Sequence, residues 1–260
     1  MGKMTPTDQK QGVSSTALKA LRALEVVAES PTPLSVGDIA SELGEGKITT
    51  YRMMVTLEQA GYVSRDPSSK RYSLSYKVVS LSRNLLAENE VSRQIQETLR
   101  TITHATHETL HYSVLDGFEA VLVYRVKGSQ LVNVDFQIGD RTPLNCTSVG
   151  KAILAYQNDD FIDRFIESGL ERRTEKTITE PDKLHAELRR IREKGYALDE
   201  RELSPSMRCV AVPVFSKGGV SSGISISGPV SRFSRKYLLE LKDKMLAEAT
   251  ELSRRLGGTP

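Results

Sequence analysis

The sequence is poor in the residues that mark secreted and membrane proteins. It has no tryptophan and only two cysteines, Cys146 and Cys209, in 260 residues. Two cysteines make no disulfide framework, which favours a reducing compartment. No apolar run approaches the ~18 residues of a membrane span, and the polar start of the chain lacks the apolar centre of a secretory signal. We therefore expect a cytoplasmic protein with no membrane partner.

The remaining composition is typical of an ordinary globular chain. Hydrophobic residues make up 38% of the sequence and charged residues 27%, as in folded domains. A length of 260 residues suggests two compact domains or one large one. The net charge of +3 permits an anionic partner without requiring one.

Three helices and a hairpin are expected in the first part of the chain. An apolar stripe begins at Ser15 and ends at the prolines of "ESPTP". A second helix lies in "LSVGDIASELG", where Ser35 and Asp38 have nearly the spacing and chemistry of a capping box. A third helix covers "KITTYRMMVTLEQAG", and "YVSRDPSSKRYSLS" has a turn between two alternating runs. This order predicts a winged helix-turn-helix.

After about residue 90 the pattern changes to strands joined by hairpins. A helix leads into the strand-like runs "LHYSVLD", "EAVLVYRV" and "LVNVDF", and "YALDE", "CVAVPVF" and "VSSGISISG" follow later. Helical periodicity marks "SVGKAILAY", "DDFIDRFIESG", "PDKLHAELRRIREKG" and about residues 234–256. Strands joined by hairpins with separate helices predict an α+β domain around an antiparallel sheet.

Positive charge concentrates on the third helix and the hairpin. Residues 47–77 hold six lysines and arginines against two acidic residues, a net charge of +4. Such groups contact DNA phosphates, and short polar side chains at the start of a recognition helix suit base edges. A solvated helix face would have a similar composition. The predicted DNA contacts are Lys47, Thr49, Thr50, Tyr51, Arg52, Arg65, Lys70 and Arg71.

The segment "HETLH", residues 107–111, fits the H-E-x-x-H pattern of zinc hydrolases. Two histidines bind one zinc this way only if they share a helix face. Because "LHYSVLDGFEAVLVY" is strand-like, we expect His107 and Glu108 to end a helix and His111 to begin a strand. The glycine and third histidine of the longer zinc motif are also missing. We therefore expect no metal site and no cofactor.

Taken together, the two halves resemble the IclR family of bacterial transcriptional regulators over about residues 15–256. The resemblance rests on "LSVGDIASELGEGKITTYRMMVTLEQAGYVSRDPSSKRYSLS", "GDRTPLNCTSVGKAILAY" and "GYALDERELSPSMRCVAVPVF…GISISGP". It implies a regulator, not an enzyme, that binds a double-stranded DNA operator and a small carboxylate or aromatic effector as a homodimer or homotetramer. Repression and activation are both compatible with it. The runs "RRTEKTIT" and "SRFS" resemble the branch that responds to sugar-acid breakdown products such as 2-keto-3-deoxygluconate.

The resemblance also implies a domain plan. We expect a disordered tail (1–14), a winged helix-turn-helix DNA-binding domain (15–75), a linker helix (76–90) and a GAF-like effector-binding domain (91–260). The run "GEGKITT" departs from the family pattern, since Ile48 stands where a serine is usual. The operator sequence therefore cannot be copied from relatives.

The family's effector pocket can be carried over by motif. Free N–H groups at the helix start in "TSVGKA" favour a carboxylate, and the serines of "SIS" alternate on one strand face. Ser148 and Val149 replace smaller residues that are common in the family, which would narrow the pocket. The implied effector contacts are Leu131, Val134, Thr147, Ser148, Val149, Asp199, Cys209, Ser225 and Ser227.

A cysteine-based enzyme or redox sensor is the alternative function. A nucleophilic thiol needs a nearby base, and the sequence places none of the four histidines beside Cys146 or Cys209. A buried cysteine is more often a small hydrophobic side chain.

Overall fold

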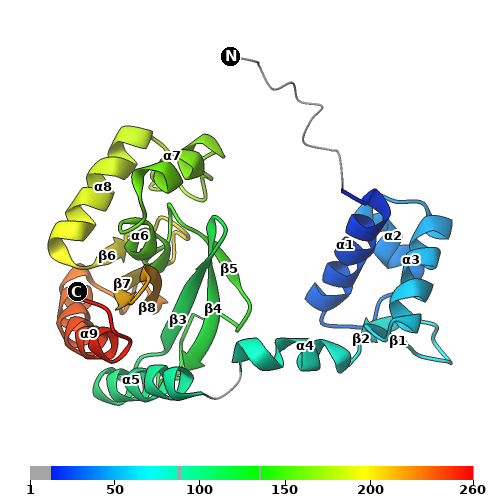
Figure 1. Cartoon of the computed structure of the whole chain (residues 1–260), viewed down its shortest axis with the longest axis horizontal. Helices are drawn as coiled ribbons and strands as arrows, with labels where there is room; N and C mark the ends of the chain where they lie inside the picture. The colour runs from blue at the N-terminus through cyan, green and yellow to red at the C-terminus, as the bar shows by residue number, and fades with distance from the viewer. Residues whose placement is uncertain (1–12, 87–88, 135, 260) are drawn as a thin grey trace. The chain divides into compact units, whose positions relative to one another are not determined.

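The computed structural model describes residues 13–86, 89–134 and 136–259. The chain forms two compact units, Met1–Ala87 and Glu88–Pro260 (Figure 1). Apart from its last two residues, the tail predicted for residues 1–14 lies outside the described part. In that part, no helix has the length and apolar character to cross a membrane.

The first unit is a winged helix-turn-helix, as predicted. Its elements are α1 (Ser15–Glu29), α2 (Val36–Leu43), α3 (Lys47–Gln59), β1 (Val63–Arg65), β2 (Tyr72–Leu74) and α4 (Lys77–Leu86). The strands β1 and β2 pair antiparallel, and Leu34 adds a backbone bridge to Tyr72. One apolar cluster joins the first three helices to the hairpin through Ala23, Val27, Ile39, Met54, Leu57, Val63 and Tyr72.

Local caps define the helix-turn-helix. At the start of α2 the Ser35 hydroxyl accepts a hydrogen bond from the Asp38 N–H at 3.2 Å. The Asp38 carboxylate accepts one from the Ser35 N–H at 2.8 Å, so the predicted capping box is complete. Helix α2 ends at Gly44, whose φ of 65° suits a residue without a side chain. These caps fix where α3 begins.

The second unit has an antiparallel sheet with helices on both faces (Figure 1). The described strands are β3 (Leu110–Asp116), β4 (Glu119–Val126), β5 (Arg141–Pro143), β6 (Ala197–Asp199), β7 (Met207–Ser216) and β8 (Gly219–Pro229). Their order is β5-β4-β3-β8-β7-β6, with every neighbouring pair antiparallel. The helices are α5 (Glu90–Thr106), α6 (Ser148–Leu154), α7 (Asp159–Glu167), α8 (Pro181–Lys194) and α9 (Arg235–Arg255).

One predicted strand is wrong. The described residues of "LVNVDF" form no strand, and the partner of β4 is β5, farther along the chain. Leu131 is fully exposed and Val132 is 62% exposed, so these apolar side chains do not pack against a core. Alternation predicts a strand only when one face is buried and a neighbouring strand accepts the hydrogen bonds.

The two faces of the sheet differ. Helices α5 and α9 pack on one face against Val210, Val212 and Val214. Helices α6, α7 and α8 belong to a second cluster on the other face, with Ala197 and Ala211. Because strand side chains alternate, β6 and β7 contribute buried residues to both layers.

The "HETLH" segment is a structural junction. Helix α5 ends at Thr106, His107 caps it with a φ of 62°, and His111 lies in β3. The two histidines therefore share no helix face. Glu108 is fully buried, and its carboxylate accepts hydrogen bonds from Arg232 Nε at 3.0 Å and Nη2 at 2.9 Å. Glu108 thus ties the end of α5 to the segment before α9.

Breaking this ion pair from one side should destabilise the second unit strongly. Arg232→Met leaves the buried Glu108 carboxylate without its cation, which should lower the free energy of unfolding by about 3–5 kcal/mol. Glu108→Leu combined with Arg232→Met should recover most of that loss, since an apolar pair of similar size fills the site. Urea unfolding followed by circular dichroism measures both. Arg254→Met, which affects an exposed ion pair with Glu251, is the control and should change stability by less than about 0.5 kcal/mol. Equal stability of Arg232→Met and the parent chain would contradict this role.

Candidate functional site

The recognition helix α3 presents a polar and basic outer face. Its inner face buries Met53, Met54 and Leu57. Of the predicted contacts on this helix, four are exposed: Lys47, Thr49, Tyr51 and Arg52. Gly46 at its N-cap makes no side-chain cap, so the first N–H groups of α3 remain available for a phosphate.

The prediction that Thr50 contacts DNA is wrong. Its side chain is fully buried, and its hydroxyl donates to the Gly46 carbonyl at 3.2 Å. Residues 50, 53, 54 and 57 lie on one helical face because α-helices have 3.6 residues per turn. Thr50 therefore packs in the core and cannot reach a base edge.

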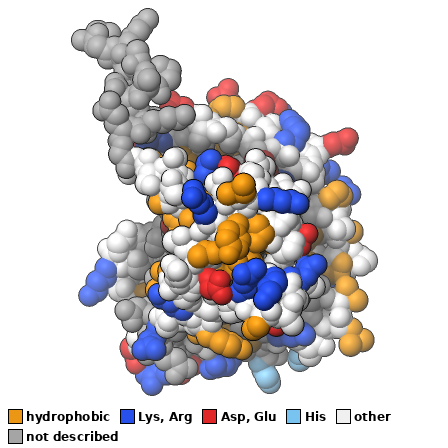
Figure 2. All heavy atoms as spheres, turned by 90° about the vertical axis from the view of Figure 1, so that its right-hand side faces the viewer, with side chains coloured by type: hydrophobic (Ala, Val, Ile, Leu, Met, Phe, Trp, Pro, Cys, Tyr) orange, Lys and Arg blue, Asp and Glu red, His pale blue; other side chains and the backbone are white. Residues whose placement is uncertain are grey.

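The basic residues of the hairpin have different surroundings. The Arg65 guanidinium lies over the rings of Tyr51 and Tyr72, at 5.9 and 5.5 Å from their centroids. Arg71 donates to the Pro33 carbonyl at 2.9 Å and pairs with Asp38 at 3.3 Å. Lys70 is exposed at the turn. Arg65 and Arg71 therefore join the hairpin to the helices, and Lys70 projects into solvent. Lysine and arginine side chains surround a group of hydrophobic side chains on the face shown in Figure 2.

A cavity lies in the second unit between the sheet and α6. Its empty space is about 400 Å³, including the part that opens to solvent. Five strands, β3, β4, β5, β7 and β8, supply side chains to it. Some of these residues are paired in register, for example His111 with Ser225 and Cys209 with Ser227. The lining residues are His111, Ser113, Leu122, Phe136, Asp140, Thr142, Thr147, Ser148, Val149, Leu203, Met207, Cys209, Ser225 and Ser227.

Gly223 allows α6 to approach the sheet this closely. A Cβ atom at Gly223 would lie 3.2 Å from the Val149 side chain and 3.0 Å from the Val212 carbonyl oxygen. Both distances are shorter than ordinary van der Waals contact. A side chain at this point of β8 would therefore push against α6.

Six of the nine predicted effector contacts line the cavity: Thr147, Ser148, Val149, Cys209, Ser225 and Ser227. The other three do not. Asp199 is buried behind the wall, Leu131 is fully exposed, and Val134 is half-buried outside the lining set. The Thr147 hydroxyl is already engaged, since it accepts from the Gly150 N–H at 3.0 Å and donates to the Pro143 carbonyl at 2.8 Å.

Sequence reasoning missed eight lining residues. His111 and Ser113 alternate on β3 and so share a face, which the sequence could have shown. Asp140 and Thr142 lie in the motif "GDRTPLNCTS", which was singled out for other residues. The remaining four have no local signal, because only the fold brings them together: Leu122, Phe136, Leu203 and Met207.

The cavity is weakly charged, and its accessible surface is mostly apolar with polar side chains set among the apolar ones. Among the described residues that line it, none is lysine or arginine, and Asp140 is the only carboxylate. The wall formed by β3, β8 and α6 carries four serines, Ser113, Ser148, Ser225 and Ser227. The His111 and Phe136 rings are nearly perpendicular, with 5.7 Å between their centroids. Such a wall can hydrogen-bond a polar ligand from several sides.

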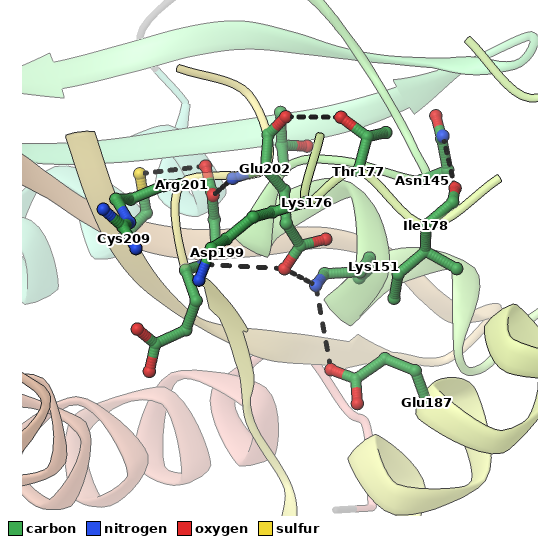
Figure 3. A network of polar contacts seen from close by, with 12 residues as sticks. Asn145, Lys151, Lys176, Thr177, Ile178, Glu187, Asp199, Arg201, Glu202 and Cys209 are labelled. Carbon is green, nitrogen blue, oxygen red and sulfur yellow. Dashed lines mark hydrogen bonds and ion pairs between the residues drawn. The ribbon is translucent and has the colours of Figure 1, made fainter. Parts of the chain in front are cut away.

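A buried ionic network supports the wall from behind (Figure 3). Lys151 of α6 is 1% exposed, and its ammonium group lies 2.5 Å from Glu202 and 3.7 Å from Glu187. The Glu202 carbonyl accepts a hydrogen bond from the Thr177 hydroxyl at 2.7 Å. Because Leu203 follows directly and lines the cavity, this network holds one wall of the site in place.

Asp199 completes the network. Its Oδ1 accepts a hydrogen bond from the Glu202 N–H at 2.6 Å, and its Oδ2 accepts one from the Cys209 thiol at 3.8 Å. Burial raises the pKa of Asp199 to about 7, and the hydrogen bond from the Glu202 backbone acts in the opposite direction. Burial also raises the pKa of Glu202, while Lys151 opposes this shift.

The cysteines lie in surroundings that disfavour a thiolate. Burial raises the pKa of Cys146 to about 12 and that of Cys209 well above its usual value, and the nearby Asp199 carboxylate adds to both shifts. A nucleophilic or redox-sensing cysteine needs a lowered pKa. The geometry therefore argues against the cysteine-based alternative.

Comparison with known proteins agrees with both units. The profile "IclR helix-turn-helix domain" matches residues 16–67, and "Bacterial transcriptional regulator IclR C-terminal" matches residues 83–254. The HTH-type transcriptional regulator KdgR of Escherichia coli (strain K12) is 32% identical over 253 residues, covering 96% of this chain and 95% of that protein.

Solved structures show the same architecture. The Thermotoga maritima IclR structure is 33% identical and covers 93% of this chain and 98% of its own, with a TM-score of 0.74. The IclR transcriptional regulator from Alicyclobacillus acidocaldarius is 26% identical and covers 93% of this chain and 98% of its own, with a TM-score of 0.79.

A winged helix followed by an antiparallel-sheet domain with an internal cavity defines a two-part DNA-binding regulator. This chain belongs to the IclR family of bacterial transcriptional regulators. It is accordingly a regulator and not an enzyme.

Asp199 should make the stability of the second unit depend on pH. Its pKa is about 7 in the folded chain against a model value of 3.8, so the folded state binds more protons between these values. Stability therefore falls as pH rises from about 4 to 7. Asp199→Asn removes the cost of burying a charged carboxylate. The free energy of unfolding should therefore rise by up to about 4 kcal/mol at pH 8 and by little at pH 4. Thermal unfolding of both chains across this range measures the difference, and parallel curves would contradict the assignment.

Proposed function

We propose that this chain is a ligand-responsive regulator of a catabolic operon, acting in the cytoplasm, and that its cavity binds a small carboxylate effector. The observation that carries the proposal is the cavity against the first turn of α6, where serine and threonine side chains lie among apolar ones, in a chain whose other unit is a winged helix. The proposed parts are the DNA-binding domain (15–75), the linker helix (76–90) and the effector domain (91–260).

The cavity chemistry supports a small hydroxylated monocarboxylate. Its described lining residues include no lysine or arginine, so the second negative charge of a dianion would have no cationic side chain to neutralise it. A single carboxylate can accept hydrogen bonds from the N–H groups at the start of α6 and from Ser148. Ser225 and Ser227 can bind hydroxyl groups of the same ligand. A sugar-acid breakdown product such as 2-keto-3-deoxygluconate has this combination.

Self-association is part of the proposal. The first unit exposes large apolar side chains on α1 and just before and along α4, where isolated exposure is unfavourable. Leu21 is 55% exposed, Val79 66% and Tyr76 93%. We propose that these faces pair with a second copy, which gives a homodimer or a homotetramer with two-fold related recognition helices.

Operator binding tests the DNA-reading part of the proposal. The full chain should shift a DNA fragment from upstream of its own or adjacent genes, with an affinity that falls steeply with salt because phosphate contacts release counterions. Arg52→Ala should lower specific affinity about ten-fold and nonspecific affinity less. Mass photometry should show an even number of chains per fragment.

The exposed Lys176 lies in the second unit, and Lys176→Ala is the control that should leave the shift unchanged. Salt-independent binding, or no binding to any of these fragments, would refute this part of the proposal.

Effector binding is tested by removing one hydroxyl. Ser225→Ala should weaken the binding of 2-keto-3-deoxygluconate or a related hydroxy acid about five-fold, the value of one hydrogen bond. Leu131→Ala is the matched control, because Leu131 is fully exposed and does not line the cavity. Calorimetry across a panel of hydroxy and keto acids measures both. If no acid binds the parent chain, the proposed effector class is wrong.

A further inference from the structure

One large apolar side chain on the recognition helix is mostly exposed to solvent. Ile48 is 79% exposed, although it lies in the first turn of α3 beside strongly polar neighbours. An isoleucine left in water forgoes the free energy of burial that the same side chain would gain in a core. Ile48 is therefore available to a partner from outside the folded unit.

The helix geometry directs Ile48 away from the core. Successive residues are about 100° apart around an α-helix. Residues 50, 53, 54 and 57 are buried, and their mean direction lies about opposite to that of residue 48. Tyr51 and Arg52 lie one turn along the same outer face and are both exposed. Ile48 is therefore near the centre of the surface that α3 presents to its partner.

The surroundings of Ile48 are basic. Lys47 and Arg52 flank it on α3, and the whole of α3 holds one acidic residue, Glu58, near its far end. A protein partner for an apolar side chain would bring its own apolar surface, but such a partner would also bury these cations. A polyanion satisfies both features, because phosphates pair with the cations while the groove floor meets the isoleucine.

The major groove of DNA offers one apolar group, the 5-methyl of thymine. Isoleucine can neither donate nor accept a hydrogen bond, so it cannot read the polar edges of the other bases. We propose that Ile48 is a specificity-determining residue that contacts a thymine methyl group in each operator half-site. The inference rests on the DNA-binding function of the winged helix and adds the base that this position selects.

Replacing thymine by deoxyuridine tests the proposal, since it removes the methyl group and leaves base pairing intact. Sites are first selected from a random duplex library with the full chain. Each thymine of the best site is then replaced in turn, and affinities are measured for the parent chain, Ile48→Val and Ile48→Ser. Replacement at one position in each half-site should weaken binding by the parent chain about three- to five-fold, which corresponds to the burial free energy of one methyl group.

The variants separate specificity from folding. Ile48→Val should keep most of the sensitivity to deoxyuridine at that position, and Ile48→Ser should lose it. Because residue 48 is exposed, neither change should alter thermal unfolding. Lys47→Ala is the control and should weaken binding to thymine and deoxyuridine sites by the same factor, as expected for a phosphate contact.

Two results would overturn the inference. The first is a selected site at which no deoxyuridine replacement distinguishes the parent from Ile48→Ser. The second is a loss of self-association in Ile48→Ser without DNA, which would assign the residue to a protein interface. Failure to select any site would instead contradict DNA binding itself, so the two failures can be told apart.

Discussion

The two-sided sheet of the second unit is the constraint on which the cavity depends. Side chains of a β-strand point alternately to opposite faces, and on β7 and β8 this alternation separates two kinds of residue. Val210, Val212, Ile224 and Ile226 face the core formed with α5 and α9. The intervening residues Ala211, Gly223 and Ser225 are small. If both faces were filled by large apolar residues, α6 would pack on the sheet without leaving a space.

The buried ionic network is the second condition for the site. A fully buried lysine is costly unless paired, and Lys151 meets that condition with Glu202 and Glu187. Its partners come from different segments, so their pairing draws the loop after β6 against α6. The wall of the cavity is thus supported by charges that do not themselves contact the ligand space. Asp199 has this supporting position as well, although the family pattern implied a direct contact.

Particular residues show how far the sequence could predict each unit. The capping box of Ser35 and Asp38 is a local feature, with both hydrogen bonds made within four residues, and it was predicted. The helical period could also have placed Thr50 on the inner face, since it lies one and two turns before the apolar Met54 and Leu57, and Ile48 on the opposite face. Polarity alone favoured Thr50 as a DNA contact. In the folded unit Thr50 is buried and its apolar neighbour Ile48 is exposed, so Ile48 and not Thr50 can contact a base.

Apart from the strand wrongly expected in "LVNVDF", the sequence by itself determined the order of the main elements, the class of fold and the failure of "HETLH" as a zinc site, since period, turns and caps act over a few residues. The tertiary structure alone decided the pairing of Glu108 with Arg232, more than a hundred residues apart, and the membership of the cavity wall. Leu122, Phe136 and Leu203 meet there because antiparallel pairing and the helix packing on that face bring distant segments together. Local periodicity carries no information about such distances, so these contacts become visible only in the folded chain.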